Sequence, residues 1–271
     1  MSTPTRLEHG PITPLIPIRT LLLLLALVAV VPLGGCRTVA ELEAPEIEAA
    51  FEGEIEAGDL VLLPGTNFED FDALDISSSF EVDVIQGERF EVTVRVSEGI
   101  LDRVEVAQDG STLRLGVAAR GLLGFRMDDL ELEATITMPE LVAVDLSGAS
   151  TMRCNGFASE RDLRIDISGA STLDGALSAG DTIIDASGAS TVSLAGEGGD
   201  LRVDASGAST VDLSDYVVAD AKIDASGASN VDLDVRGRLD AEAGGASSVH
   251  YGGSPELGSI DTSGAGSVRE R

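Results

Sequence analysis

The fold is decided by the stretch Ile184-Asp185-Ala186-Ser187-Gly188-Ala189-Ser190-Thr191-Val192, because closely similar stretches recur through the C-terminal half of the chain. Seven copies begin, in order, at Val144, Ile165, Ile184, Val203, Ile223, Ala241 and Ile260. The copy at Ala241 is degenerate, with Glu242 in place of Asp and Gly244 in place of the first Ser. Equivalent residues of successive copies are 18 to 21 residues apart. A repeat of this length indicates a solenoid in which each copy forms one coil.

Each copy contains two short strands separated by a corner. An apolar–polar–apolar triplet such as Ile184-Asp185-Ala186 precedes the Gly, and a second triplet such as Val211-Asp212-Leu213 follows it. Alternation with a period of two directs the Asp outward and the apolar residues inward. Glycine at the corner permits backbone angles that other residues resist. The predicted corner glycines are Gly148, Gly169, Gly188, Gly207, Gly227, Gly245 and Gly264.

A coil of this size is too small to bury its own apolar face, so the coils must stack. A strand spacing of about 4.8 Å gives seven coils a length of roughly 34 Å. A leucine-rich repeat has a similar period, but its Leu/Asn frame is absent. The sequence therefore predicts an all-β chain: a parallel β-helix or a closely related β-solenoid, with about seven repeat coils over residues 141–268.

Residues 67–140 also favour β-structure, and this segment is the β-rich lead-in to the repeats. Residues 80–84 and 90–96 alternate strictly, and Gln86-Gly87-Glu88-Arg89 between them is a plausible hairpin loop. A second pair of alternating runs flanks Gln108-Asp109-Gly110-Ser111, where Asp-Gly suits a turn that needs positive φ. We find no convincing amphipathic helix in this segment.

Composition and charge restrict the partners. The chain has 31 Gly, no Trp and 3% aromatic residues, so its core must consist of thin layers of Val, Ile, Leu and Ala. The formal net charge is −29, and Lys222 is the single lysine. Such a polyanion is repelled by nucleic acid and by anionic lipid headgroups. Cations, basic proteins and neutral glycans remain possible partners.

The N-terminus has the features of an export signal. Arg6 and Arg19 precede an unbroken apolar stretch from Leu21 to Val31, which is too short for a comfortable membrane span. Leu33-Gly34-Gly35-Cys36 then resembles a bacterial lipobox. We predict a lipoprotein signal peptide over residues 1–35 and lipidation at Cys36; the alternative is an uncleaved anchor with a chance cysteine.

The residues after Cys36 predict which membrane carries the protein and how the folded domain is attached to it. Arg37 stands where an Asp would be the usual inner-membrane retention cue, so the outer membrane is favoured if the cell is Gram-negative. Between Glu41 and Asp59 the chain carries eight acidic residues and no basic one. Like charges at this density extend a chain. We therefore predict an acidic tether over residues 36–66 that holds the domain away from the bilayer.

The alternating strands that end in the Asp109-Gly110 turn, followed by the Asp-x-Ser-Gly-Ala-Ser repeat, resemble a known family. This is the "putative auto-transporter adhesin, head GIN domain" family, and the resemblance covers about residues 67–268. It implies an exported bacterial protein, often a lipoprotein, with a β-helical fold. It implies no catalytic residues.

Catalytic groups are scarce. His250 is the one histidine outside the predicted signal, so a multi-His metal site is excluded within one chain. Cys154 has inward parity on its strand, which favours a buried, inert thiol over a nucleophile. Some β-helix enzymes cleave acidic polysaccharides with Asp, Arg and Lys, but this chain has few bases. We predict no enzyme activity and no cofactor.

The outward acidic residues of the repeat occupy one register: Asp145, Asp166, Asp185, Asp204, Asp224, Glu242 and Asp261. The structural hypothesis is that each carboxylate accepts hydrogen bonds from corner N–H or Ser groups, and that Arg164, Arg202 and Lys222 neutralise Asp166, Asp204 and Asp224. Ile183 occupies the basic position beside Asp185, so that coil is expected to depend on hydrogen bonds alone. The alternative hypothesis is a divalent-cation site, for which carboxylate oxygens suit Ca²⁺. We favour the structural hypothesis and predict no metal.

The Ser-Thr pairs after each Gly form a second ladder, which runs from Ser150-Thr151 to Ser229-Asn230. The two residues are adjacent and should point apart, which argues against an ice-binding array and favours a solvated or glycan-contacting face.

The sequence as a whole favours a non-catalytic, lipid-anchored envelope protein that is adhesin-like or mediates envelope interactions. The rival is a carbohydrate-active β-helix lyase or hydrolase, which a cleft lined by Asp with an Arg or Lys would support. A third hypothesis is an envelope-sensing module that acts with partner proteins.

Overall fold

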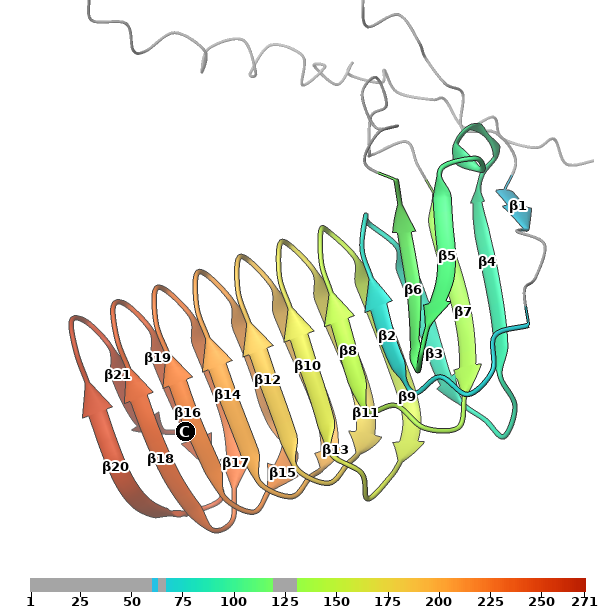
Figure 1. Ribbon diagram of the computed structural model, residues 1–271. Coiled ribbons are helices and arrows are strands. Elements are labelled where there is room, and N and C mark those ends of the chain that lie inside the picture. The colour runs from blue at the N-terminus through green and yellow to red at the C-terminus, as the bar shows by residue number, and fades with distance from the viewer. Residues whose placement is uncertain (1–59, 63–66, 119–130) are drawn as a thin grey trace, which may run out of the picture. The chain divides into compact units, whose positions relative to one another are not determined.

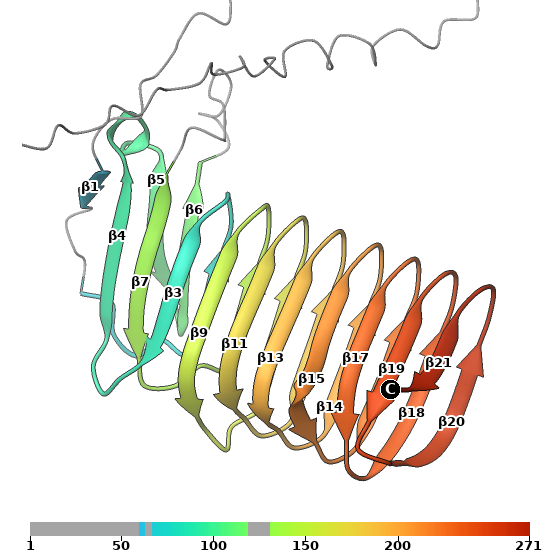
Figure 2. The same cartoon turned by 180° about the vertical axis from the view of Figure 1, so that it is seen from behind.

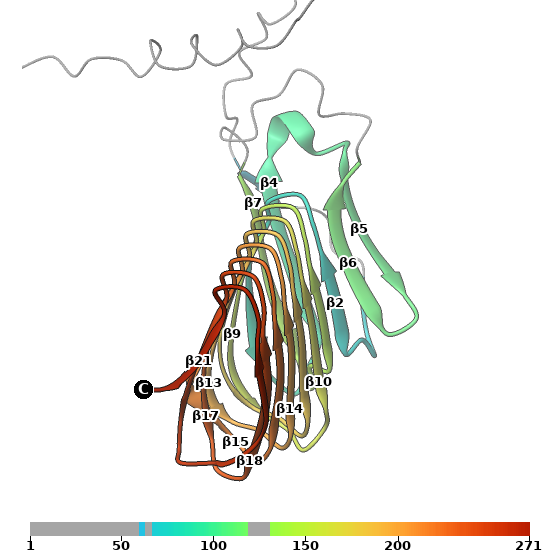
Figure 3. The ribbon, with the colours of Figure 1, turned by 90° about the vertical axis from the view of Figure 1, so that its left-hand side faces the viewer.

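The computed structural model describes residues 60–62, 67–118 and 131–271, and these residues form two long β-sheets that face each other (Figures 1 and 3). Sheet A contains, in spatial order, β1 (Leu60–Leu62), β4 (Glu91–Ser97), β7 (Leu132–Met138), β3 (Glu81–Gln86), β9 (Thr151–Ala158), β11 (Thr172–Ser178), β13 (Thr191–Glu197), β15 (Thr210–Val218), β17 (Asn230–Val235), β19 (Ser248–Gly252) and β21 (Ser267–Glu270). Sheet B contains β20 (Glu256–Thr262), β18 (Arg238–Ala243), β16 (Ala221–Ala225), β14 (Leu201–Ala205), β12 (Thr182–Ala186), β10 (Leu163–Ile167), β8 (Ala143–Leu146), β2 (Ala73–Ile76), β6 (Thr112–Val117) and β5 (Val104–Asp109).

The repeat builds a β-solenoid. Each of the seven copies places one strand in sheet B, turns at the corner and places the next strand in sheet A, as the rear view in Figure 2 shows for sheet A. Neighbouring coils pair in parallel; in β12 and β14, for example, Ile184 pairs with Val203 and Asp185 with Asp204. The predicted all-β solenoid with seven repeat coils is confirmed. The only helical element among the described residues is a 3-10 turn, η3 (Glu98–Ile100), and no helix there could cross a membrane.

The core lies between the two sheets and consists of thin aliphatic layers. In every coil but the last, the residues on either side of the outward acidic residue are buried; Ile184 and Ala186 beside Asp185 are 0% and 2% exposed. Tyr216 is the largest fully buried side chain, and its hydroxyl shares a 3.0 Å hydrogen bond with the hydroxyl of Thr182. Small aliphatic side chains therefore fill the space between the two sheets in most coils, without an aromatic ring in each one.

The seven predicted corner glycines all have positive φ, between +67° and +80°. The corners also stack directly on one another. A Cβ added to Gly207 would lie 2.5 Å from the carbonyl oxygen of Gly188 in the preceding coil. The corner N–H groups reinforce this stacking, because the N–H of Ala208 donates to the same oxygen at 2.7 Å. Glycine is thus required both by φ and by the space between coils.

The stack begins before the first copy of the repeat. β2 pairs in parallel with β8, so that Asp75 lies opposite Asp145, and β3 pairs in parallel with β9. Ser78 occupies the position of the corner glycine at a φ of +70°. Its hydroxyl oxygen accepts a hydrogen bond from the N–H of Val117 at 3.3 Å. Residues 73–86 therefore form a coil that the sequence analysis did not recognise, because serines replace the Gly-Ala of the corner.

Strands β4, β5, β6 and β7 come between that coil and the next one in the sequence, and they extend both sheets at the N-terminal end of the stack (Figure 1). The predicted Asp109-Gly110 hairpin is confirmed, since β5 and β6 are antiparallel and Gly110 has a φ of +62°. The predicted hairpin at residues 86–89 is wrong. β7 lies between β3 and β4, parallel to the first and antiparallel to the second.

We predict that Gly207→Val destabilises the fold by about 1–3 kcal/mol, because it combines a strained φ with a clash against the preceding corner. Urea unfolding measures the effect. The matched control is Ala208→Val, which enlarges an exposed residue of the same corner that lacks positive φ. Equal effects of the two substitutions would show that the stacked glycines do not constrain the fold.

Candidate functional site

The outer face of sheet B carries a single file of acidic side chains, which we call the carboxylate row. Parallel pairing places its members opposite one another on successive strands: Asp75, Asp145, Asp166, Asp185, Asp204, Asp224, Glu242 and Asp261. The register follows from the pattern, because each acidic residue except Asp261 of the last coil lies between two buried apolar residues on a short strand. Asp75 was not among the acidic residues predicted for this register. The pattern that could have identified it is Leu74-Asp75-Ile76-Ser77, which matches the start of the repeat.

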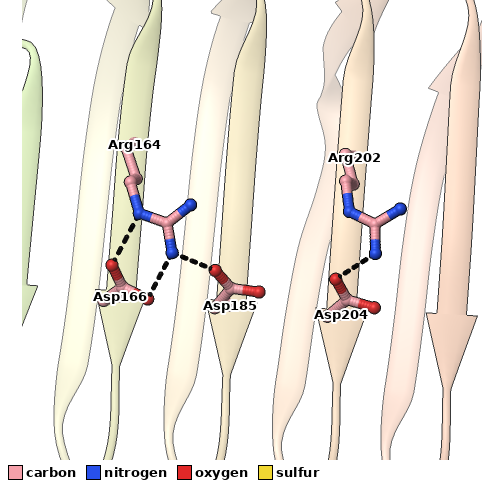
Figure 4. Close-up of polar contacts among 5 residues, drawn as sticks. All are labelled: Arg164, Asp166, Asp185, Arg202 and Asp204. Carbon is pink, nitrogen blue, oxygen red and sulfur yellow. Dashed lines mark hydrogen bonds and ion pairs between the residues drawn. The ribbon is translucent and has the colours of Figure 1, made fainter.

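Arginines neutralise part of the carboxylate row (Figure 4). The Arg164 guanidinium donates to both oxygens of Asp166, at 2.9 and 3.1 Å, and to Asp185 Oδ2 of the next coil at 2.5 Å. Arg202 Nη2 lies 2.6 Å from Asp204 Oδ2. The expectation that the Asp185 coil depends on hydrogen bonds alone is therefore wrong. A guanidinium is long enough to cross one strand spacing, so Arg164 also serves the coil that has Ile183 in the basic position.

Two other expected contacts are wrong. Lys222 forms no ion pair with Asp224, and neither Asp145 nor Asp224 has a hydrogen bond or ion pair with a described residue. The corner N–H groups do not reach the row, because they donate to carbonyl oxygens of the preceding coil, as Ser187 N–H does to Ile167 at 2.9 Å. Corner geometry therefore leaves much of the row without direct compensation.

The electrostatic surroundings raise the pKa of two members of the row. For Asp145 the main cause is the desolvation that accompanies partial burial, followed by the charges of Asp75 and Asp166, while Arg114 acts in the opposite direction. For Asp185 desolvation again comes first and raises the pKa. Arg164 lowers it, and Asp166 and Asp204 raise it.

The row lines a shallow hollow of about 510 Å³ along the corner side of sheet B. Carboxylates and corner serines alternate in its lining: Asp145, Asp166, Ser168, Asp185, Ser187, Asp204, Ser206, Asp224 and Ser226. A second hollow of about 320 Å³ lies further along the sheet, and Lys222 lines it together with Asp224, Asp240, Glu242 and Asp261. Within residues 60–62, 67–118 and 131–271, no group of three or more His, Cys, Asp or Glu side chains lies close enough together to hold a metal ion.

A second set of aspartates, which the sequence analysis missed, ties the coils together on the return side. We call it the return ladder, and it consists of Asp162, Asp181, Asp200 and Asp220. Each Oδ1 accepts a backbone N–H from the next coil, as Asp181 N–H donates to Asp162 at 3.0 Å. Asp240, which pairs with Lys222 across β18 and β16, likewise accepts the N–H of Ser259 and also binds Arg238, and these contacts lower its pKa to about 2. The sequence signal for the return ladder was an Asp that recurs about every 19 residues, just before each sheet-B strand.

The outer face of sheet A carries a row of hydroxyl and amide groups. Thr151, Thr172, Thr191, Thr210, Asn230, Ser248 and Ser267 lie in register there, and all are half-buried. The prediction that adjacent Ser and Thr point apart is confirmed, but the serines are not part of a solvated face. Ser190 is 1% exposed, like its equivalents in the other coils. In three coils the serine hydroxyl donates to a carbonyl three residues earlier, for example Ser150 to Ser147 at 2.9 Å.

The two residues considered for catalysis lie apart. Cys154 is 1% exposed on β9, and burial raises the pKa of its thiol to about 12, which keeps it protonated. His250 lies on the outer face of sheet A, with Nδ1 3.2 Å from Asp232 Oδ1. Cys36 lies outside the described residues. The structure therefore assembles two long polar faces rather than a convergent set of reactive groups.

We predict that Arg164→Ala lowers the free energy of unfolding by about 0.5–1 kcal/mol, and Arg202→Ala by less. Both side chains are half-exposed, so each ion pair contributes little to stability. Arg164, however, pairs with carboxylates of two coils, whereas Arg202 pairs with one carboxylate in its own coil. Urea unfolding at pH 7 in low salt compares the two variants. A larger loss for Arg202→Ala would contradict the bridging role of Arg164.

We also predict that millimolar Ca²⁺ raises the melting temperature by roughly 1 °C or less, because a ligand stabilises a fold only when it binds the folded state at the concentration used. The control is NaCl at matched ionic strength. A Ca²⁺-specific rise of several degrees, abolished by Asp185→Ala, would instead make the carboxylate row a cation site.

Solved structures share this fold at low sequence identity. A crystal structure of a "putative adhesin" from Bacteroides fragilis is 17% identical, with a TM-score of 0.72 over 80% of this chain and 99% of that chain. A "putative adhesin" from Parabacteroides merdae is 17% identical, with a TM-score of 0.57 over 79% and 97%. A "putative lipid binding protein" from Parabacteroides distasonis is 14% identical, with a TM-score of 0.57 over 79% and 96%. At these identities the likeness shows the fold alone.

No curated protein sequence matches this chain. The model of one protein family does, over residues 70–255, which span the first coil, the inserted strands and the repeat up to the end of β19. The match therefore covers most of the solenoid whose rows are described above. The chain belongs to the "putative auto-transporter adhesin, head GIN domain" family.

Proposed function

We propose that this protein is a lipid-anchored component of the bacterial cell envelope whose solenoid binds envelope or surface molecules without catalysis. The observation that carries the proposal is the pair of straight polar rows, one on each outer face, held in register over seven coils. A repeated row offers the same group at each strand spacing of about 4.8 Å. A repetitive partner such as a glycan chain can then make many weak contacts at once, which raises its apparent affinity.

The charge of the chain restricts the partner further. At a net charge of −29 the protein repels polyanions, so neutral glycans and basic or neutral envelope proteins are the partners that fit. The hydroxyl row on sheet A suits hydrogen bonding to a neutral glycan. Two structural relatives are described as adhesins and one as a lipid binding protein, and those descriptions agree with an exposed binding role.

The anchor is the second part of the proposal. Leu33-Gly34-Gly35 ends the apolar stretch immediately before Cys36, as lipid attachment to that cysteine requires. The acidic segment after Cys36 then acts as a tether between the bilayer and the solenoid. It ends before residue 60, earlier than the predicted residue 66, because β1 (Leu60–Leu62) pairs with β4 in sheet A. In a Gram-negative cell, Arg37 after the cysteine favours the outer membrane.

We predict that the mature protein begins at a lipidated Cys36 and that Cys36→Ser releases it from the membrane fraction. Mass spectrometry of the N-terminal peptide and membrane fractionation measure the two effects. Cys154→Ser is the matched control and leaves anchoring unchanged, because Cys154 is buried in the solenoid. An intact residue 1, or a membrane-bound Cys36→Ser variant, would disprove lipid anchoring.

A binding screen against glycans and envelope proteins tests the binding role. For a ligand that contacts sheet A, Thr172→Arg with Thr191→Arg lowers the affinity at least tenfold, because two bulky charges interrupt the hydroxyl row. A matched pair on sheet B, Asp166→Arg with Asp204→Arg, leaves that affinity unchanged. The reverse pattern would assign binding to the carboxylate row, and no binding to any envelope component would contradict the proposal.

One observation favours the rival function of a carbohydrate-active enzyme. The smaller hollow combines Lys222 with Asp224 and Glu242, side chains of the kinds that β-helix polysaccharide lyases and hydrolases use. Incubation of the screened glycans with the protein decides between the functions. New reducing ends or unsaturated products, lost in Asp224→Asn or Glu242→Gln, would establish the enzyme.

A further inference from the structure

The carboxylate row concentrates negative charge that the fold only partly balances. Adjacent members are one strand spacing, about 4.8 Å, apart. Three arginines contact the row: Arg114 pairs with Asp75 at 3.3 Å, Arg164 with Asp166 and Asp185, and Arg202 with Asp204. Unit charges this close repel by about 0.9 kcal/mol even at the dielectric constant of water. The folded chain therefore holds together carboxylates that separate when it unfolds.

Asp145 is the member most clearly surrounded by like charge. Parallel pairing places Asp75 of β2 on one side and Asp166 of β10 on the other. Two arginines lie nearby. Arg114 of β6, the strand beyond β2, pairs with Asp75 and Asp109, and Arg164 of β10 pairs with Asp166 and Asp185. Both guanidinium groups are thus engaged elsewhere. Asp145 is left without an ion pair of its own.

Asp185 has a similar position two coils further along. It lies between Asp166 of β10 and Asp204 of β14, and it shares the Arg164 guanidinium with Asp166. The other cation near it, Arg202 of β14, donates to Asp204. One guanidinium thus serves two carboxylates in two coils.

We propose that Asp145 and Asp185 make the carboxylate row a pH-responsive element: acidification protonates these two side chains while the solenoid stays folded, and this uptake of protons strengthens the fold. A proton added to one member removes the repulsion with both of its neighbours. The protonated carboxyl group can also donate a hydrogen bond, which a carboxylate cannot. The same chemical change therefore lowers the charge of the sheet-B face and tightens the contact between coils. This property is independent of the partner proposed above.

The direction of the effect follows from linkage. The pKa of Asp145 and of Asp185 is raised in the folded chain, first by desolvation and then by neighbouring carboxylates. Between the raised pKa and the ordinary value of about 3.9, the folded state binds more protons than the unfolded state. Stability from these groups therefore rises as the pH falls through the folded pKa, and the gain is complete below about pH 3.9.

Asp240 has the opposite response and provides an internal reference. The pKa of Asp240 is lowered to about 2 by the hydrogen bonds that it accepts from Arg238 and from the N–H of Ser259. Its contribution to stability is present above about pH 3.9 and is lost as the pH falls toward 2. Asp240 therefore responds to acid with the opposite sign to Asp145 and Asp185.

The test measures thermal unfolding of the full chain, purified in a non-ionic detergent, at pH 7 and at pH 4. Asp145→Asn raises the melting temperature by roughly 2 °C at pH 7, and the gain is smaller at pH 4, because the native carboxyl group takes up protons as the pH falls. The matched control is Asp215→Asn, which removes the same charge from an exposed aspartate with no hydrogen bond or ion pair to a described residue and changes little at either pH. Asp240→Asn lowers the melting temperature at pH 7.

Carbon-13 NMR of the aspartate carboxyl groups, assigned by the same variants, gives a second measurement that does not depend on stability. The proposal requires the Asp145 carboxyl to titrate above the ordinary aspartate value of about 3.9. An Asp145 carboxyl that titrates at or below that value would overturn the proposal. So would an Asp145→Asn variant that is no more stable than the native chain at pH 7.

Discussion

The structure depends on the close contact between successive corner glycines. A side chain at Gly188, Gly207 or Gly227 would place its Cβ 2.5 Å from the carbonyl oxygen of the corner before it, and each corner donates an N–H to that same oxygen. This contact fixes the distance and the register between coils. Every outward residue then repeats in a straight file, whether it is acidic on sheet B or a hydroxyl on sheet A. The functional faces are consequences of the corner geometry.

Stacking in register places carboxylates of successive coils close together, where they repel. The return ladder and the carboxylate row compensate this repulsion in different ways. In the return ladder each carboxylate accepts a backbone N–H from the next coil, so the acidic side chain itself joins the coils. In the carboxylate row the corner N–H groups already bind carbonyl oxygens, so the side chains depend on arginines that are too few for all of them. The row therefore keeps an excess of charge on one face. A face with excess negative charge is better suited to binding a partner or responding to pH than to stabilising the fold.

The repeat made most of this architecture predictable, because period-two alternation sets the faces and the glycines mark the corners. The first coil was not predictable in the same way. Ser78 adopts a positive φ that its residue type does not indicate, and residues 91–138 separate the coil from its neighbour in sequence. The hairpin predicted at residues 86–89 was wrong for a related reason, since β7 comes from a distant segment and takes the place between β3 and β4.

The side-chain contacts of the candidate site were harder to predict from the sequence than its register. The register of the carboxylate row follows from sequence, but the second contact of Arg164 depends on a guanidinium that crosses to the next strand. The return ladder was visible only as an Asp recurring near the sheet-B strands, and its hydrogen bonds required the turn geometry. The family shown for this chain agrees with a surface role and adds no catalytic residue.

Distances between spin labels on the carboxylate row test the stacked register most directly. Labels at Asp166→Cys and Asp261→Cys are five coils apart, and labels at Asp145→Cys and Asp261→Cys are six apart. Cys154 is buried and stays unlabelled, and Cys36→Ser removes the other thiol. The account predicts narrow distributions centred near roughly 24 and 29 Å, differing by one strand spacing. Broad distributions, or two distances that do not differ by about 5 Å, would contradict a solenoid whose coils stack in register.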